Sequence, residues 1–168
     1  MKDKPSLQDC LQEYKTQLEQ GIIQQAYRGL MQYMLELRTQ FQKTFPDYEV
    51  PGNLYFGYMD MTYFAVIPDF LKQRKLKTAV VFLHEAFRFE AWLSGYNRQA
   101  QAAYWELIRT SRPGSYRLVP DPLKADAILE HVLVEEPDFN DPELLTDLIV
   151  KGTEAFILYI EQFFQAQE

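Results

Sequence analysis

Four ionisable residues near the middle of the chain are of the types that acid–base chemistry needs. They are Asp60, His84, Arg88 and Glu90. A histidine beside a carboxylate can titrate near neutral pH, and an arginine next to it could hold an anionic group of a substrate. Such a set would suit a small hydrolase or transferase. We favour the alternative, in which Arg88 pairs with Glu90 or Asp60 in a structural ion network, because structural ion pairs perturb such groups as readily as active sites do.

The same stretch is rich in aromatic residues, which could bind a ligand without transforming it. Trp92, Tyr96, Tyr104 and Trp105 could line an aromatic pocket, although packing in a core and at its rim is the commoner reason for such residues. The candidate binding residues are Tyr58, Thr62, Trp92, Tyr96, Asn97 and Arg98.

The sequence lacks the familiar motifs of nucleotide, metal and hydrolase sites. There is no Gly-x-Gly-x-x-Gly, no Gly-Lys-Ser/Thr and no Gly-x-Ser-x-Gly. His84-Glu85 begins like the helix of a zinc protease, but Arg88 stands where the second histidine ligand would be. A single Cys and 2 His exclude a cysteine zinc cluster, an internal disulfide and a histidine-rich metal site. We therefore expect no metal and no cofactor.

The charge balance argues against nucleic acid or an anionic membrane as a partner. The chain has 17 Lys and Arg against 24 Asp and Glu, a net charge of −7. The basic run from Lys72 to Lys77 could contact phosphate, but in so acidic a chain we interpret it as a solvated connector. The N-terminus is polar and no apolar run approaches the roughly 20 residues that cross a bilayer. We expect a cytoplasmic protein.

The N-terminal quarter has the apolar spacing of helices. Ser6 is a candidate N-cap, and apolar residues recur at helical intervals from Leu7 to Leu18 and again from Ile23 to Phe45. Gly21 interrupts this pattern, so we predict a helical hairpin or one long helix broken at Gly21. Cys10 lies beside the first apolar stripe and is expected to be a small buried residue.

The middle of the chain changes to the pattern of strands. We predict strands at about 54–67, 78–84 and 87–93, the first central in its sheet because both of its faces are mostly apolar. The last two would form a hairpin that turns near Glu85-Ala86. That hairpin would place His84, Arg88, Glu90 and Trp92 on one face, with Asp60 and Thr62 nearby. A single helix over 78–93 is the alternative, and it would put His84 and Arg88 four positions apart on one side.

The remainder of the chain is predicted to be mostly helical. Asn97 can cap a helix, residues 116–119 could form a short strand, and Asp121-Pro122 begins a helical pattern that continues through Leu133. A final helix follows Pro142, and its broad apolar side could dock a protein partner or a second copy of the chain. The whole chain, 1–168, is best described as a single α+β domain with a small antiparallel sheet; an all-α fold is the alternative.

Several stretches resemble a bacterial family of small stand-alone proteins known only as a domain of unknown function. The most distinctive is Gly57-Tyr58-Met59-Asp60-Met61-Thr62-Tyr63-Phe64. The others are Ala26 to Met31, Leu76-Lys77, His84-Glu85, Phe89 to Gly95, Asn97-Arg98 and Tyr104-Trp105. The resemblance implies a cytosolic bacterial protein, and it carries over no activity, cofactor or catalytic residue. We expect a non-enzymatic module that binds a small molecule or a protein, with a small hydrolase or transferase as the alternative and a homo-oligomer as one form it could take.

Overall fold

The computed structural model describes residues 4–111 and 114–167, which form two compact units, Met1–Glu36 and Leu37–Glu168. The first unit contains α1 (Leu7–Gln20) and most of α2 (Ile22–Thr44). At the start of α1, Ser6 and Asp9 form the reciprocal hydrogen bonds of a capping box, and the helix ends at Gly21 with φ 74°. The predicted break at Gly21 is confirmed. The expected burial of Cys10 is wrong, because α1 has no buried residue and Cys10 is exposed.

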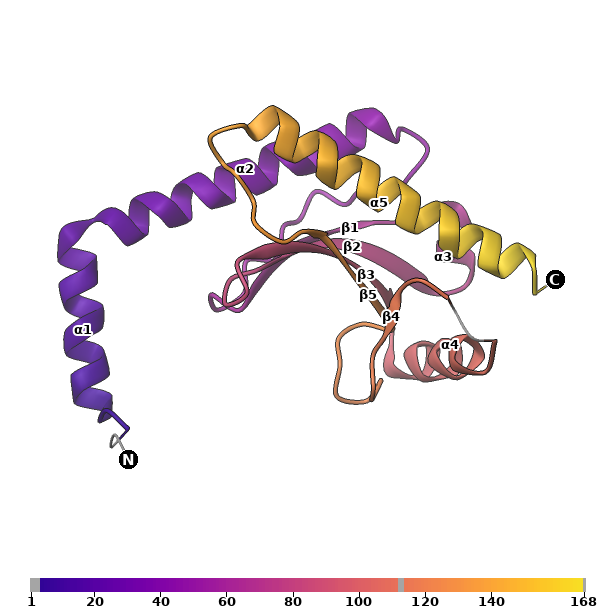
Figure 1. Ribbon diagram of the computed structural model, residues 1–168, viewed down its shortest axis with the longest axis horizontal. Helices are drawn as coiled ribbons and strands as arrows, with labels where there is room; N and C mark the ends of the chain where they lie inside the picture. The colour runs from indigo at the N-terminus through magenta and orange to yellow at the C-terminus, as the bar shows by residue number, and fades with distance from the viewer. Residues whose placement is uncertain (1–3, 112–113, 168) are drawn as a thin grey trace. The chain divides into compact units, whose positions relative to one another are not determined.

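The second unit is built on a five-stranded sheet, which confirms the α+β prediction and excludes the all-α alternative (Figure 1). Every neighbouring pair of strands is antiparallel, in the order β1-β2-β3-β5-β4. The strands are β1 (Met61–Val66), β2 (Leu76–Leu83), β3 (Arg88–Gly95), β4 (Arg117–Leu118) and β5 (Leu129–Val134).

The hairpin of β2 and β3 forms as predicted, but the residues of β2 and β3 that share a face of the sheet are not the predicted ones. Its turn is residues 84–87, with Phe87 at φ 53°, and Leu83 pairs with Arg88. An even number of turn residues pairs odd positions of one strand with even positions of the other. Arg88 therefore shares a face with Leu83, whereas His84 follows the opposite face. The prediction that His84 and Arg88 lie on one face was wrong for this reason.

The predicted strand at 54–67 is shorter than expected and lies at the edge of the sheet. The chain folds back at residues 57–60, so that Tyr55 pairs with Tyr63, and Glu49 pairs with Ile67 just beyond β1. These bridges cover the outer side of β1, which explains why an edge strand has apolar residues on both faces. Gly57 has φ 68°, and a Cβ there would lie 2.1 Å from the carbonyl oxygen of Met61.

Residues 125–133 are not helical, contrary to the prediction. Their apolar positions have helical spacing, yet the segment ends in β5, which pairs with β3 on one side and β4 on the other. The peptide N–H of Ile128 donates to the carbonyl of Leu93 at 2.6 Å, and that of Val119 donates to the carbonyl of Ile128 at 3.0 Å. Pairing with strands distant in sequence outweighs the local pattern here.

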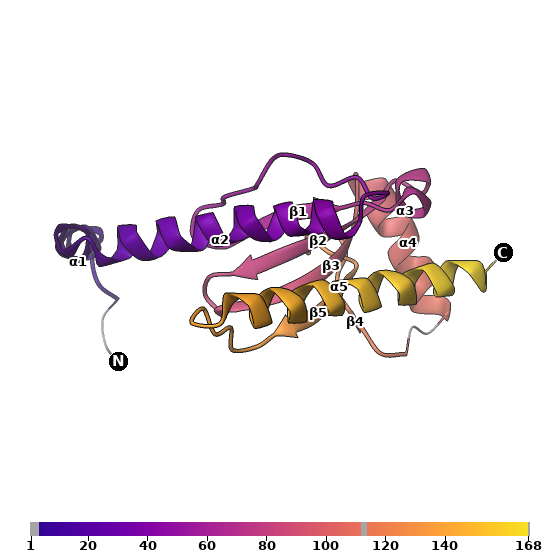
Figure 2. The ribbon, with the colours of Figure 1, turned by 90° about the horizontal axis from the view of Figure 1, so that it is seen from above.

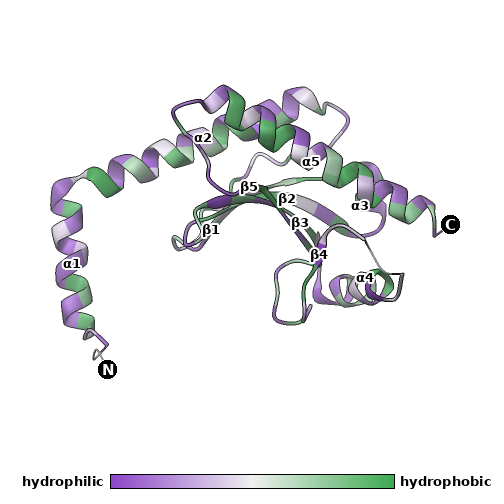
Figure 3. Ribbon diagram, viewed as in Figure 1, coloured by the Kyte–Doolittle hydropathy of each residue, from purple (hydrophilic) through white to green (hydrophobic). Residues whose placement is uncertain are grey.

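The helices leave the two faces of the sheet very different. Helix α5 (Pro142–Gln165) begins at its N-cap Asp141 and crosses one face, as Figures 1 and 2 show. Hydrophobic and hydrophilic bands alternate along α5 in Figure 3, as expected for a helix with one apolar side. We call the face beneath α5 the covered face; its residues include Phe64, Val80, Phe82, Phe89, Ala91 and Leu93, all buried.

Two further helices close the unit around the sheet. Helix α3 (Asp69–Gln73) links β1 to β2, and α4 (Arg98–Ser111) follows β3 at the end of the sheet, where Tyr104 meets Phe164 of α5 at 5.5 Å between ring centroids. The start of α4 at Asn97 is confirmed, since the Asn97 side chain accepts from the peptide N–H of Ala100 at 2.8 Å. None of the described helices is long and apolar enough to span a membrane.

Candidate functional site

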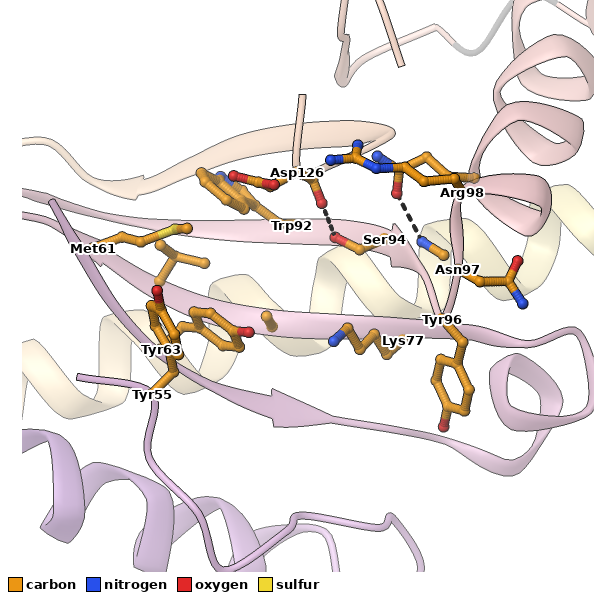
Figure 4. Close-up of a pocket in the computed structure, with 14 residues that line it drawn as sticks. Tyr55, Met61, Tyr63, Lys77, Trp92, Ser94, Tyr96, Asn97, Arg98 and Asp126 are labelled. Carbon is orange, nitrogen blue, oxygen red and sulfur yellow. Dashed lines mark hydrogen bonds between the residues drawn. The ribbon is translucent and has the colours of Figure 1, made fainter. Parts of the chain in front are cut away.

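A cavity of about 460 Å³ lies on the other side of the sheet, which we call the open face (Figure 4). Its volume is within the range of pockets for small organic molecules. The floor comes from β1, β2 and β3, and the sides come from the segment before β1, the start of α4 and the segment before β5. The residues around it are Tyr55, Met61, Tyr63, Lys77, Ala79, Val81, Trp92, Ser94, Gly95, Tyr96, Asn97, Arg98, Gln101 and Asp126.

Aromatic side chains form the walls of one half of the cavity. The rings of Tyr55 and Tyr63 stack with centroids 4.9 Å apart. They are cross-strand neighbours through the bridge described above, so the fold-back at 57–60 holds them together. Trp92 lies opposite on β3, and its indole N–H donates to Glu90 at 2.6 Å. The ring orientation is therefore fixed by a hydrogen bond that does not use the cavity.

Glu90 also binds Arg88, so this carboxylate connects Arg88 to Trp92 in the wall of the cavity. Glu90 is only 3% exposed, and Arg88 contacts it at 2.7 Å through Nη2 and at 2.8 Å through Nε. Arg88 reaches Glu135 at 3.0 Å as well. A buried carboxylate needs this number of partners to offset its desolvation. Of the two interpretations of these residues, the geometry is that of an ion network, with Arg88 bonded to Glu90 and not to Asp60.

The opposite half of the cavity is polar and is built where β3 runs into α4. Gly95 is needed there, because a Cβ would lie 2.5 Å from the peptide nitrogen of Gln101. The buried amide of Gln101 accepts from the Gly95 N–H at 3.0 Å and donates to the Ala125 carbonyl at 2.9 Å. Arg98 donates to the same carbonyl at 2.9 Å, and Ser94 donates to the carbonyl of Asp126 at 2.8 Å. These bonds hold the segment before β5 against the start of α4.

Three charged side chains border the cavity: Lys77, Arg98 and Asp126. The Lys77 amine lies 5.9 Å from the centroid of the Tyr63 ring. Burial raises the pKa of Tyr63, and the neighbouring Tyr55 and Asp126 raise it further. Tyr63, like an ordinary tyrosine, keeps its hydroxyl proton at neutral pH and can donate a hydrogen bond into the cavity.

Asp60, His84 and Thr62 lie away from this cavity. The carboxylate of Asp60 accepts from the peptide N–H groups of Met61 at 2.7 Å and Tyr58 at 2.9 Å, and these bonds lower its pKa. Thr62 bonds to His84 at 2.9 Å and donates to the Phe56 carbonyl at 2.9 Å. These contacts place Asp60 and His84 in the two turns at one end of the sheet and Thr62 beside them in β1.

His84 belongs with the covered face. Its ring meets Phe82 edge to face at 5.2 Å, and burial lowers its pKa despite the opposing charge of Asp60. Because Arg88 and Glu90 lie on the open face, the four candidate catalytic residues do not converge on one cleft. None of them borders the cavity in the part of the chain that the structure describes.

Of the six candidate binding residues, four border the cavity and two do not. Trp92, Tyr96, Asn97 and Arg98 surround it, Thr62 is buried under the covered face, and Tyr58 is 94% exposed in the turn before β1. The two ends of the basic run from Lys72 to Lys77 have different surroundings. Lys72 pairs with Glu49 at 2.5 Å, and Lys77 borders the cavity. Within the described residues, no group of three or more His, Cys, Asp or Glu side chains could hold a metal ion.

Sequence reasoning missed the residues that reach the cavity from a distance. Tyr55 and Tyr63 were expected within one strand, Lys77 within a connector and Asp126 within a helix. One signal was available: Lys77 is a charged residue at the start of an apolar strand pattern, directly before Thr78. Asp126 carried no such signal, because its place depends on the pairing of β5 with β3.

Comparison with known proteins gives a family and no function. The curated proteins and the solved structures contain no significant match to the chain. The model of one protein family matches residues 7–164, which is nearly the whole sequence and includes every residue around the cavity. The chain therefore belongs to the family described as Domain of unknown function (DUF7000).

Proposed function

We propose that this protein is a non-enzymatic binding module that holds a small organic molecule with a flat apolar part in the cavity of the open face. The observation that carries the proposal is a cavity of about 460 Å³ between the stacked Tyr55–Tyr63 pair and Trp92. Flat rings stack well on such side chains, and apolar contact supplies most of the binding free energy of small molecules.

The polar groups around the cavity support binding more than catalysis. The groups with catalytic potential, His84 and Asp60, are engaged elsewhere, and Glu90 is held by Arg88 and Trp92. The side chains that do reach the cavity include no nucleophile bonded to a base among the described residues. They can accept, donate and stack, which is what recognition of a ligand requires.

Binding of N-phenyl-1-naphthylamine, a neutral aromatic probe that fluoresces in apolar surroundings, tests the proposal. Trp105 is replaced by Phe, so that Trp92 is the remaining indole; Trp105 lies outside the cavity, bonded to the Val119 carbonyl at 2.8 Å. We expect the probe to become fluorescent on binding and to quench Trp92. In the reciprocal Trp92→Phe protein, the probe should quench Trp105 less, because Trp105 does not border the cavity.

A substitution that fills the cavity gives the most direct test of the proposal. Ala79 lies on the floor, and Ala79→Leu should weaken probe binding at least about tenfold, because the added carbons occupy the space of the ligand. Leu83→Met is the matched control, on the same strand and face but outside the cavity. Circular dichroism checks that both proteins fold. Probe binding that is absent in the parent protein, or unchanged by Ala79→Leu, would contradict the proposal.

A further inference from the structure

We infer that the ligand carries an oxyanion, a carboxylate or phosphate group, and that Lys77 is the residue that holds it. This inference rests on the proposed function, since it concerns the ligand of the same cavity. It is carried by the position of Lys77, by the lack of a carboxylate partner for its amine, and by the excess of positive charge around the cavity.

Lys77 occupies a place on the sheet where a lysine is costly. It lies in β2, half-buried, and pairs with Ser94 of β3. Figure 4 shows the side chain extended along the floor of the cavity, with its amine toward Tyr55 and Tyr63. A strand residue at this place would normally be apolar or would point its charge into open solvent, because removing an ammonium group from water costs free energy.

The amine of Lys77 has no counter-ion within the described residues. The amine lies over the face of the Tyr63 ring, 5.9 Å from the ring centroid, in a cation–π contact. Two other basic side chains of the same run have polar partners: Lys72 pairs with Glu49 at 2.5 Å, and Arg74 donates to the carbonyl of Phe70 at 2.8 Å. In a chain with a net charge of −7, a half-buried lysine that pairs with none of the acidic residues described in the structure is available to an anion from outside.

The surroundings of Lys77 add to this preference. Arg98 brings a second positive charge, and α4 begins at Arg98, so the positive end of its helix dipole lies at the polar half of the same cavity. The protonated hydroxyl of Tyr63 can donate to an oxyanion. Among the described residues that border the cavity, Asp126 is the one with a carboxylate, and it makes no ion pair with Lys77. Two cations against one carboxylate leave a net positive site in an acidic protein.

Two probes with the same rings distinguish the contribution of charge to affinity from that of shape. 1-Anilinonaphthalene-8-sulfonate is the sulfonated counterpart of N-phenyl-1-naphthylamine, and its sulfonate stands for the oxyanion of the ligand. We expect the anionic probe to bind at least about tenfold more tightly than the neutral one, as a charge-assisted hydrogen bond allows. Lys77→Gln should abolish this difference by weakening the anionic probe alone.

The matched control for Lys77→Gln is Lys75→Gln. It removes the same charge two positions away, from an exposed residue that does not border the cavity, and it should leave both affinities unchanged. Equal binding of the two probes, or equal loss of the anionic probe in both variants, would overturn the inference about Lys77. If the neutral probe still binds and still responds to Ala79→Leu, the proposed function survives that result, whereas failure of both probes to bind would remove both.

Competition distinguishes the two sources of the oxyanion. 2-Naphthoate and 2-naphthyl phosphate share an apolar body and differ in their charged group. The compound that displaces the anionic probe at the lower concentration identifies the group that the site prefers, and this preference should disappear in Lys77→Gln. Displacement that is just as effective with 2-naphthamide, the neutral amide, would contradict recognition of an oxyanion.

Discussion

The two faces of the same sheet are built for different purposes. On the covered face, Phe82 and Phe89 pack with ring centroids 5.0 Å apart, and Phe156 of α5 lies above the neighbouring His131 at 6.2 Å. On the open face, the alternate residues of the same strands include Lys77 and Trp92, which border a cavity. One strand therefore contributes to a dry core and to a ligand site through successive residues.

The polar groups of the two faces show what the difference means. On the covered face, Thr78 donates to the carbonyl of Val66, and Thr62 bonds to His84 and to a carbonyl. On the open face, Glu90 is satisfied by its neighbours, whereas the Lys77 amine has no carboxylate partner among the described residues. Internal pairing indicates a structural role, and a charge left for an external partner indicates binding.

The largest effect on stability is expected from a substitution in the core under the covered face. Phe156 is fully buried and touches Tyr116 edge to face at 4.9 Å, so Phe156→Ala should lower the free energy of unfolding by about 3–5 kcal/mol through lost contacts and a cavity. Urea denaturation measures this change. Tyr55→Ala on the open face is the comparison, and because Tyr55 is 42% exposed we expect a loss of about 1 kcal/mol or less together with weaker probe binding. Similar losses for both would mean that the faces do not differ as argued.

An intermediate effect is expected where the open face is structural. Glu90→Gln keeps an acceptor for Trp92 but removes the charge that Arg88 needs, and we expect a loss of about 2–3 kcal/mol. Glu135 is the other partner of Arg88, and the Glu135 side chain is 64% exposed. Glu135→Gln should therefore lower the free energy of unfolding by no more than about 0.5 kcal/mol. A larger cost for Glu135→Gln than for Glu90→Gln would contradict the assignment of Glu90 as the anchor of the network.

Local patterns in the sequence predict much of this arrangement. The apolar spacing of α1, α2 and α5, the caps at Ser6 and Asn97, and the alternation in β2 and β3 are all signals between near neighbours. They sufficed for the α+β class and for the central hairpin. They also placed Trp92 and the start of α4 near each other, because β3 leads directly into that helix.

The remaining features depend on contacts that a local pattern does not contain. Helical spacing at 125–133 was overruled by pairing with β3, and the strand expected at 54–67 was cut short by the turn that Gly57 and Asp60 make. The face of His84 depended on the parity of a four-residue turn. The cavity combines Tyr55, Lys77 and Asp126, which meet because of the fold-back before β1 and the pairing of β5 with β3.

The smallest expected effect is a pH dependence of stability that arises from the histidines of the covered face. Burial lowers the pKa of both His84 and His131, against the opposing charges of Asp60 and Glu90 respectively. Between the lowered folded value and the ordinary value of about 6.5, the unfolded chain binds more protons than the folded one. The contribution of these two histidines to stability should therefore be complete above about pH 6.5 and decrease as the pH falls below that value.

Denaturation at a series of pH values measures this slope. His131→Phe keeps an aromatic ring between Tyr116 and Phe156 while removing the titrating group, so it should make the slope shallower. No histidine borders the cavity in the described chain, so the affinity of the folded protein for the neutral probe should stay constant over the same range. A slope unchanged in His131→Phe, or a probe affinity that follows the stability curve, would show that the covered face does not respond to acid independently of the open one.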